Sequence, residues 1–275
     1  MAERPLRHNT KVAIAGMGAI GATLVRQLSR GDVPGVDLVG VSVRDMAKGR
    51  ATLDAMGVNV PMVALEQLAV IADVVIECIP AALLEQVVRP VLNAGKKVVV
   101  LSVGALLNHP DLIELARATG GQVIVPTGAL LGLDAVCAAA EGKIHSVTMV
   151  TRKPIVGLLG ARYLIENSID IAHAKQPVRL FKGTAREAAK GFPANLNVAV
   201  ALSLAGIGPD RTTLEIWADP TVTRNTHRIL VDSDAARIDM TIENIPSENP
   251  KTGRITALSV LSTLRKLNAA LRVGS

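Results

Sequence analysis

Hydrophobic residues in the first half of the chain fall into short, nearly continuous runs. Five runs are rich in β-branched residues and predict strands at residues 12–15, 38–43, 74–79, 98–102 and 123–125. Segments of helical composition separate them, at residues 22–28, 47–56, 65–71, 81–93 and 111–119. Continuous apolar strands that alternate with helices are typical of a parallel sheet covered on both faces. The pattern predicts an α/β domain with a Rossmann-type doubly wound parallel sheet.

The second half of the chain has strand-like segments at wider, irregular intervals. They cover residues 147–151, 178–182, 212–218, 228–231 and 238–242, with one helix near residues 194–204. Few helices between strands favour a second α+β domain with a mixed or antiparallel sheet. A final amphipathic helix is expected over residues 256–271, with its apolar stripe formed by Leu258, Leu261, Leu264, Leu267 and Leu271. We expect this helix to pack back onto the first domain.

A glycine-rich turn lies between the first predicted strand and the helix-like stretch at residues 22–28. Its predicted cofactor-binding residues are Gly16, Gly18, Ala19, Ile20 and Gly21. At this spacing the first glycine permits a tight turn, the second lets the backbone approach a pyrophosphate, and the third lets the helix pack closely on the sheet. The phosphates would meet the positive end of the helix. Glycine-rich turns also occur for steric reasons alone, so the strand-to-helix context carries the prediction.

These features divide the chain into a dinucleotide-binding domain and a catalytic and dimerisation domain. The first covers residues 1–128 and is completed by the C-terminal helix within residues 254–275; the second covers residues 129–253. With 275 residues the chain can bury a substantial core without disulfides. An antiparallel sheet in the second domain offers a two-fold interface, and we expect a homodimer.

Composition narrows the possible partners. The four aromatic residues are too few for base-stacking platforms, and the formal charge of +6 is scattered, so we expect no nucleic-acid partner. The positive charge is either a solvated surface or a potential that attracts an anionic substrate and a phosphate-rich cofactor. Cys78 and Cys137 indicate neither a disulfide nor a metal site. With neither a secretory signal nor a membrane-spanning apolar run, the chain is expected to be soluble, cytoplasmic and without a membrane partner.

The end of the second predicted strand bears on the choice of dinucleotide. An apolar residue, Val43, occupies the position where a carboxylate would take the ribose hydroxyls of NAD. Arg44 beside it could pair with the 2′-phosphate of NADP or stack on adenine. Asp45 would serve NAD if the register were shifted. We therefore expect NAD or NADP as cofactor, with Arg44 favouring NADP.

Several motifs after residue 127 are more specific than the glycine turn. They are Gly128-Ala129, residues 192–198, residues 203–206, Ala218-Asp219-Pro220 and Arg224-Asn225-Thr226-His227. Together they resemble the L-aspartate dehydrogenase family, and further motifs extend the resemblance across nearly the whole chain. The resemblance implies oxidation of L-aspartate at Cα to iminoaspartate, with hydride transfer to NAD or NADP. The imine then enters synthesis of the nicotinamide cofactor or is hydrolysed to oxaloacetate and ammonia.

The same resemblance implies roles for individual residues. Ala129 and Asn197 would contact the cofactor, and His227 would be the catalytic residue. Without the resemblance, Asn197 would be expected to cap a helix. The chain departs from the family pattern at Ile79-Pro80, where members often carry Ala-Gly after the Glu-Cys pair. That loop would lie near the cofactor, so the resemblance does not fix the details of cofactor binding or the substrate preference.

The chemistry of amine oxidation can be weighed residue by residue. The substrate ammonium must lose a proton and the imine needs a positioned water, and histidine suits both tasks. Of the five histidines, His227 is singled out by its neighbours Asp219 and Arg224 together with the family resemblance. A dicarboxylate substrate also needs cations, and the candidates are Arg152, Lys153, Arg224 and Lys251. Each of these could equally be a solvated or salt-bridged surface residue.

Two other functions fit the same residues. A related enzyme could reduce a different imine or keto acid with the same cofactor. A non-catalytic sensor could retain the dinucleotide-binding fold without chemistry, because fold alone does not establish activity.

Overall fold

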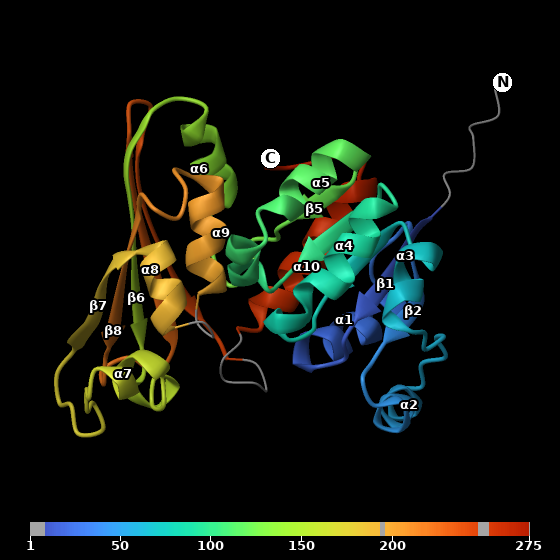
Figure 1. The fold of residues 1–275 in the computed structure, drawn as a ribbon, viewed down its shortest axis with the longest axis horizontal. Coiled ribbons are helices and arrows are strands. Elements are labelled where there is room, and N and C mark those ends of the chain that lie inside the picture. The colour runs from blue at the N-terminus through green and yellow to red at the C-terminus, as the bar shows by residue number, and fades with distance from the viewer. Residues whose placement is uncertain (1–8, 193–195, 247–252, 275) are drawn as a thin grey trace. The chain divides into compact units, whose positions relative to one another are not determined.

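The computed structural model describes residues 9–192, 196–246 and 253–274, and the chain forms two compact units (Figure 1). Unit 1 contains Met1–Pro126 and Ala257–Val273, and unit 2 contains Thr127–Thr256 with the last two residues. The division expected after residue 128 lies two residues beyond the end of the first segment of unit 1.

Unit 1 is built on a parallel sheet of five strands in the order β2-β1-β3-β4-β5. The strands are β1 (Thr10–Ala15), β2 (Val36–Ser42), β3 (Val74–Glu77), β4 (Lys97–Val100) and β5 (Gln122–Ile124). The helices of this unit are α1 (Ala19–Ser29), α2 (Met46–Ala55), α3 (Leu68–Ile71), α4 (Leu84–Asn93), α5 (Asp111–Thr119) and α10 (Ile255–Asn268).

A sixth, rudimentary strand extends the sheet beyond β2. Val41 forms an isolated parallel bridge with Met62, and its N–H and carbonyl bond to Pro61 and Val63. Counting this bridge, the strand order is that of a Rossmann sheet, with the change of direction between β1 and β3. The predicted Rossmann-type fold class is confirmed, as is the second sheet described below.

The C-terminal helix α10 completes the core of unit 1. Val260 and Leu264 are fully buried in the same hydrophobic cluster as Ile14 and Leu24. At the end of α10, the Asn268 side chain donates to the Gly35 carbonyl. Burial of each large aliphatic side chain contributes about 1.5–3 kcal/mol, so helix α10 stabilises the core of unit 1.

The expected leucine stripe of α10 is wrong at its two ends. Leu258 is 52% exposed, and Leu271 is 79% exposed and lies beyond the helix end at Asn268. The buried positions are instead Ala257, Val260, Leu261 and Leu264. This spacing of three, one and three residues keeps the side chains on one face of a helix with 3.6 residues per turn, whereas Leu258 is rotated away.

Unit 2 is built on a mixed sheet of five strands in the order β10-β9-β6-β8-β7. Its strands are β6 (Ile144–Lys153), β7 (Val178–Thr184), β8 (Thr212–Ala218), β9 (Asn225–Ser233) and β10 (Arg237–Asn244). Its helices are α6 (Leu133–Ala140), α7 (Arg162–Glu166), α8 (Ala185–Gly191) and α9 (Asn197–Ala205). The β6–β8 pair is parallel and the other pairs are antiparallel, as expected for a mixed sheet.

One face of this mixed sheet is buried and the other is partly open. Helices α6, α8 and α9 lie along the buried face (Figure 1), where Met149, Leu214 and Ile229 are almost inaccessible. Successive strand residues alternate between faces, so the intervening residues line the opposite face. Strand β9 begins at Asn225, earlier than expected, and this places His227 within a strand.

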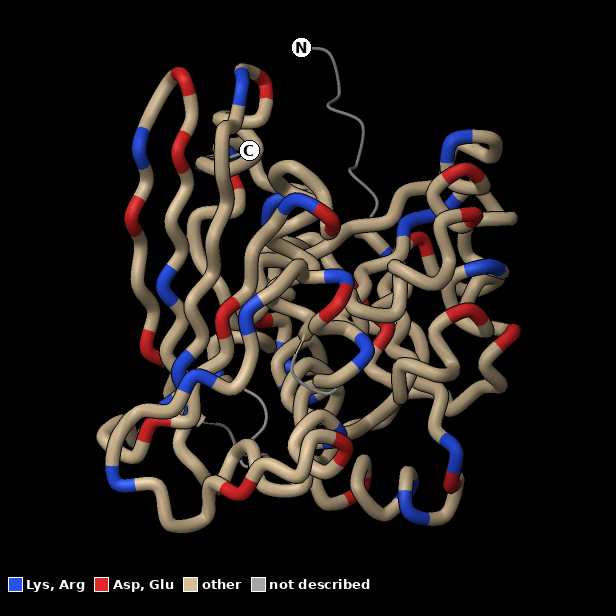
Figure 2. Tube along the Cα trace, turned by 60° about the vertical axis from the view of Figure 1, so that its left-hand side comes forward, with Lys and Arg blue, Asp and Glu red and all other residues tan. Residues whose placement is uncertain are grey.

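Charged residues of both signs are interspersed along the chain (Figure 2). Within the part of the chain that the structure describes, no helix has the length and apolar character needed to span a membrane. Nor do the described residues contain a group of three or more His, Cys, Asp or Glu side chains arranged to hold a metal ion.

Candidate functional site

The glycine turn of unit 1 requires two of its glycines for its own packing. Gly16 has a φ of +97°, and a Cβ there would lie 2.6 Å from the Cys78 carbonyl oxygen. A Cβ on Gly21, in the first turn of α1, would collide with the Gly16 carbonyl. A larger residue at either position would therefore displace the backbone of the turn.

Gly18 differs because no residue that the structure describes requires it to lack a side chain. Its backbone is extended, and an added Cβ would lie more than 4 Å from every atom of the described residues. Gly18 is also the N-cap residue of α1, and no side chain caps that helix. The first turn of α1, which contains Ala19, Ile20 and Gly21, therefore begins without a side-chain cap. This arrangement fits a pyrophosphate of a dinucleotide.

The end of β2 is followed by an exposed cation, Arg44. Ser42, the last residue of β2, accepts from Gly16 N at 2.8 Å, and Val43 lies against Gly49 of α2. The Asp45 carboxylate is the N-cap of α2 and accepts from Lys48 N at 2.9 Å. Arg44 is exposed, and its side chain makes no ion pair with any other residue that the structure describes.

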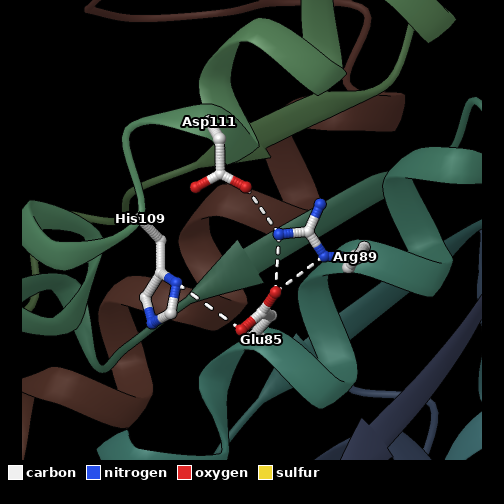
Figure 3. Close-up of polar contacts among 4 residues, drawn as sticks. All are labelled: Glu85, Arg89, His109 and Asp111. Carbon is white, nitrogen blue, oxygen red and sulfur yellow. Dashed lines mark hydrogen bonds and ion pairs between the residues drawn. The ribbon is translucent and has the colours of Figure 1, made fainter.

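An ion-pair cluster joins helix α4 to the start of helix α5 and to His109 just before it (Figure 3). Arg89 of α4 contacts both Glu85 of the same helix and Asp111 of α5, and His109 Nδ1 lies 3.7 Å from Glu85 Oε2. These side chains are partly exposed, so water weakens their attraction. His109 is thus placed in a surface cluster of unit 1.

A row of buried polar side chains lies at one end of the helix-covered face in unit 2. Thr151 and Lys153 of β6 and His227 of β9 are 4%, 5% and 3% exposed. Thr151 and His227 are direct partners across the two antiparallel strands, and Thr151 Oγ1 lies 3.1 Å from His227 Nδ1. Apolar side chains such as Met149, Leu214 and Ile229 lie farther along the same face.

Burial controls the protonation of this row. Burial, with a smaller effect of the Lys153 charge, lowers the pKa of His227 from 6.5 to about 3. Burial lowers the pKa of Lys153 from 10.5 to about 8. At neutral pH the imidazole is therefore neutral and the ammonium is mostly charged. Buried ionisable groups with such perturbed pKa values are concentrated at functional sites.

Arg152 lies on the opposite face of the sheet from this row. Its guanidinium is 2.9 Å from the Asp219 carboxylate and stacks 4.9 Å above the Trp217 ring. The other oxygen of Asp219 accepts from the N–H and hydroxyl of Thr221. Although burial of Asp219 opposes ionisation, the hydrogen bonds from Thr221 and Arg152 hold its pKa below the usual value. Arg152 and Asp219 thus fix the turn after β8.

The remaining predicted site residues lie elsewhere in unit 2 or outside the described residues. Arg224 is exposed in the turn before β9. Ala129 is half-buried, and its carbonyl accepts from the Asn244 side chain at 3.0 Å. Asn197 is the first residue of α9, and Leu196 holds the N-cap position. Lys251 lies outside the described residues.

Two contacts were not predicted from the sequence. One is the Thr151–His227 contact, because strand register across 76 residues is not visible in either segment. The other is the carboxylate of Glu77, at the end of β3, which accepts hydrogen bonds from the loops after β3 and β4. A charged residue that ends an otherwise apolar strand was the available signal for Glu77.

A Rossmann unit with an uncapped glycine turn, joined to a mixed-sheet unit with a buried histidine and lysine, defines a nicotinamide-dinucleotide oxidoreductase. Family models agree with both halves. The model described as the NAD binding domain of homoserine dehydrogenase matches residues 16–126, and the model described as aspartate dehydrogenase, C-terminal, matches residues 134–267.

Relatives of known name cover the whole chain. The chain is 58% identical over 275 residues to L-aspartate dehydrogenase of Bradyrhizobium diazoefficiens, which covers 100% of this chain and 98% of the relative. It is 60% identical over 269 residues to L-aspartate dehydrogenase 3 of Bordetella bronchiseptica, covering 98% of this chain and 99% of the relative. The chain belongs to the L-aspartate dehydrogenase family, and the resemblance seen in its sequence motifs is confirmed.

A solved structure shares the fold. The crystal structure of aspartate dehydrogenase from Thermotoga maritima matches with a TM-score of 0.74 and 24% identity, covering 97% of this chain and 100% of that chain. At 24% identity this match shows a shared fold and nothing further.

Proposed function

We propose that the protein oxidises L-aspartate at Cα to iminoaspartate and transfers the hydride to NAD or NADP. The imine is then hydrolysed to oxaloacetate and ammonia or consumed in synthesis of the nicotinamide cofactor. The observation that carries the proposal is the buried row of Thr151, Lys153 and His227 in a chain of this family. It places a neutral imidazole beside a cation on the buried face of the mixed sheet.

His227 is the catalytic residue of this proposal. Thr151 engages Nδ1, and in the tautomer whose Nδ1–H donates to the hydroxyl, Nε2 carries the lone pair. That nitrogen can accept a proton from the substrate ammonium or hold the water that attacks the imine. With its pKa lowered to about 3, mainly by burial, His227 stays neutral throughout the physiological range.

Lys153 is the substrate-binding cation that shares a face with His227. Its charge would meet a carboxylate of aspartate and so offset the loss of hydration that burial imposes on the ammonium. Arg152 lies on the other face of the sheet, and Arg224 lies in an exposed turn. Either could bind the substrate only if the substrate also reached outside the row of Thr151, Lys153 and His227. Lys251 remains a further candidate.

The dinucleotide is held by the glycine turn, with Ala129 and Asn197 as further contacts implied by the family. Arg44 is the charged group at the end of β2, and the Asp45 carboxylate is engaged as a helix cap. A cation without a nearby carboxylate partner suits the 2′-phosphate, so we favour NADP over NAD.

The assembly and setting proposed are a homodimer in the cytoplasm. The open face of the mixed sheet, which carries the half-buried Trp217, supports a two-fold interface between copies. The free thiols of Cys78 and Cys137 are compatible with a reducing compartment. Light scattering after size exclusion tests the dimer: a mass of one chain would refute it.

The central test is one assay of the purified protein against a panel of L-amino acids with NAD⁺ and with NADP⁺, following absorbance of the reduced nicotinamide. Turnover confined to L-aspartate is expected. Turnover only in the reductive direction, with another keto acid and ammonia, would instead indicate a related reductase. Cofactor binding without turnover of any substrate would indicate a sensor.

A further inference from the structure

We propose that Glu77 is a positioning residue of the cofactor site, whose carboxylate fixes the two loops that follow β3 and β4 and thereby the wall behind the glycine turn. The proposal rests on dinucleotide binding by unit 1 and not on aspartate as the substrate.

The carboxylate of Glu77 is fully buried and accepts four hydrogen bonds from two loops. Oε1 accepts from Ile79 N and from Ser102 Oγ, each at 3.0 Å. Oε2 accepts from Leu101 N at 3.1 Å and from Ser102 N at 2.8 Å. A carboxylate is an acceptor with about four lone-pair sites, so these donors saturate it. One side chain therefore joins the backbone after β3 to the backbone after β4.

This clamp lies at the change of direction in the sheet. Glu77 pairs with Ala15 at the end of β1 on one side and with Val100 at the end of β4 on the other. Open α/β sheets bind their ligands outside the carboxyl ends of the strands at this switch point. The position of Glu77 is thus set by the same strand ends that form the cofactor edge.

The clamp is in direct contact with the glycine turn through the residues that follow it. Cys78 N donates to the Ala15 carbonyl at 2.8 Å. The space beside Gly16, where a Cβ would project, is bounded by the Cys78 carbonyl oxygen at 2.6 Å and by Ile79 Cγ2 at 3.1 Å. A shift of the segment held by Glu77 would therefore move the wall of the turn.

The chemistry of the clamp requires a carboxylate. Burial raises the pKa of Glu77, and the hydrogen bonds from Ser102, Leu101 and Ile79 oppose that rise. An amide of the same shape has one acceptor oxygen and an NH₂ group that would face two donors. Glu77→Gln therefore leaves the Ile79 N–H without an acceptor if its NH₂ takes the position of Oε1, where the Ser102 hydroxyl can rotate to accept. If the NH₂ takes the position of Oε2, it leaves both the Leu101 and Ser102 N–H groups without one, although the side chain keeps its volume.

Ile79 is also where the chain departs from the family pattern. A β-branched residue followed by proline replaces the small pair expected there, and Ile79 N is one of the four donors. The clamp gives this bulkier loop a fixed position beside Gly16.

The test is isothermal calorimetry of the purified Glu77→Gln and Ser102→Ala variants with NAD⁺ and NADP⁺. We expect Glu77→Gln to raise the cofactor Kd about tenfold or more, and Ser102→Ala, which removes one donor and keeps the backbone, to raise it severalfold. The double variant should cost less than the product of the two single effects, because both act through one clamp. The KM for the amino-acid substrate should stay within about twofold of the unmodified protein, since cofactor positioning alone is disturbed.

The matched control is Glu85→Gln, which removes a carboxylate from the exposed cluster of Figure 3 in the same unit. Its cofactor Kd should be unchanged. Unaltered cofactor affinity in Ser102→Ala and Glu77→Gln would overturn the proposal, as would an equal loss in Glu85→Gln. If Glu77→Gln fails to fold, the cofactor Kd of Ser102→Ala alone tests the proposal. Failure of the aspartate assay with intact cofactor binding would refute the proposed function and leave the clamp standing.

Discussion

His227 and Thr151 are direct partners across strands β9 and β6, with Nδ1 and Oγ1 3.1 Å apart and both side chains nearly inaccessible to water. A strand fixes the backbone of each residue, and the hydroxyl fixes the rotation of the ring. The two nitrogens of the His227 ring therefore differ: Nδ1 contacts the Thr151 hydroxyl, and Nε2 is the nitrogen that we propose to act on the substrate. This is the pre-organisation that a proton-transfer group needs.

Replacing His227 by Ala should lower turnover by about 10²- to 10⁴-fold while the cofactor Kd stays nearly unchanged. In the proposed function the imidazole handles a proton or holds a water, whereas the glycine turn of unit 1 holds the dinucleotide. Steady-state rates and calorimetric cofactor titration measure the two effects. His109→Ala is the control, because His109 lies in the surface cluster of unit 1. Turnover near that of the unmodified protein would remove His227 from the mechanism.

Burial of His227 should also make the protein sensitive to acid. Its pKa is about 3 in the folded protein, against an ordinary value of 6.5 for an exposed histidine, so the unfolded chain binds the extra proton between these values. Stability is therefore fully present above pH 6.5 and falls as the pH drops toward 3. From pH 6.5 to about pH 5 this one group should remove about 2 kcal/mol of unfolding free energy. Urea titrations across that range should show a flatter decline for His227→Ala; an identical slope would contradict the assignment.

Lys153 should make substrate capture depend on pH in the alkaline range. Burial lowers its pKa to about 8, so the cation that we propose to meet a substrate carboxylate is lost as the pH rises through that value. In the unmodified protein, log kcat/KM for aspartate should fall with a slope of one above that pH. We expect Lys153→Met to lose this alkaline decline and to raise KM by about 10- to 100-fold. Arg152→Met, on the other face of the sheet, is the comparison. An alkaline limb that persists unchanged in Lys153→Met would assign it to another group.

The sequence was sufficient for the fold because its signals were local. Continuous apolar runs such as that around Val75 predict buried parallel strands, and a glycine turn between strand and helix predicts where a dinucleotide binds. The apolar stripe of α10 was partly wrong because it was drawn through the leucines. The 3.6-residue period of the helix instead buries Val260 and Leu264 and leaves Leu258 exposed. The rudimentary strand at Met62 was missed because one bridge carries no periodicity.

Only part of the candidate site could be predicted from the sequence. His227 could be selected by its neighbours and by resemblance to a family, but its partner Thr151 could not, because pairing between β6 and β9 is a tertiary property. Arg152 and Lys153 were equivalent as adjacent cations. The strand separates them, since neighbouring residues point to opposite faces, and only the register identifies Lys153 as the one beside His227.

Gly16 and Gly18 should respond differently to alanine. Gly18→Ala meets no atom within 4 Å and has a φ of −70°, so folding stability should be unchanged or raised by about 0.4–1 kcal/mol. Its cofactor Kd should nevertheless rise at least tenfold, because the Cβ occupies the approach to the α1 N-terminus. Gly16→Ala should lower the melting temperature through its positive φ and its clash with Cys78. Undiminished cofactor affinity in Gly18→Ala would show that the pyrophosphate does not approach there.

Arg44 should set the preference between the two dinucleotides. Its exposed guanidinium at the end of β2 has no carboxylate partner among the described residues, whereas Asp45 is engaged by Lys48 N. Arg44→Ser should raise the KM for NADP⁺ by about 10- to 100-fold, since a charge-assisted contact to a phosphate is lost, and should alter the KM for NAD⁺ much less. Arg50→Ser, an exposed cation farther along α2, is the matched control and should leave both values unchanged. Equal changes for the two cofactors in Arg44→Ser would mean that the guanidinium stacks on adenine, which both cofactors share, and that selectivity arises elsewhere.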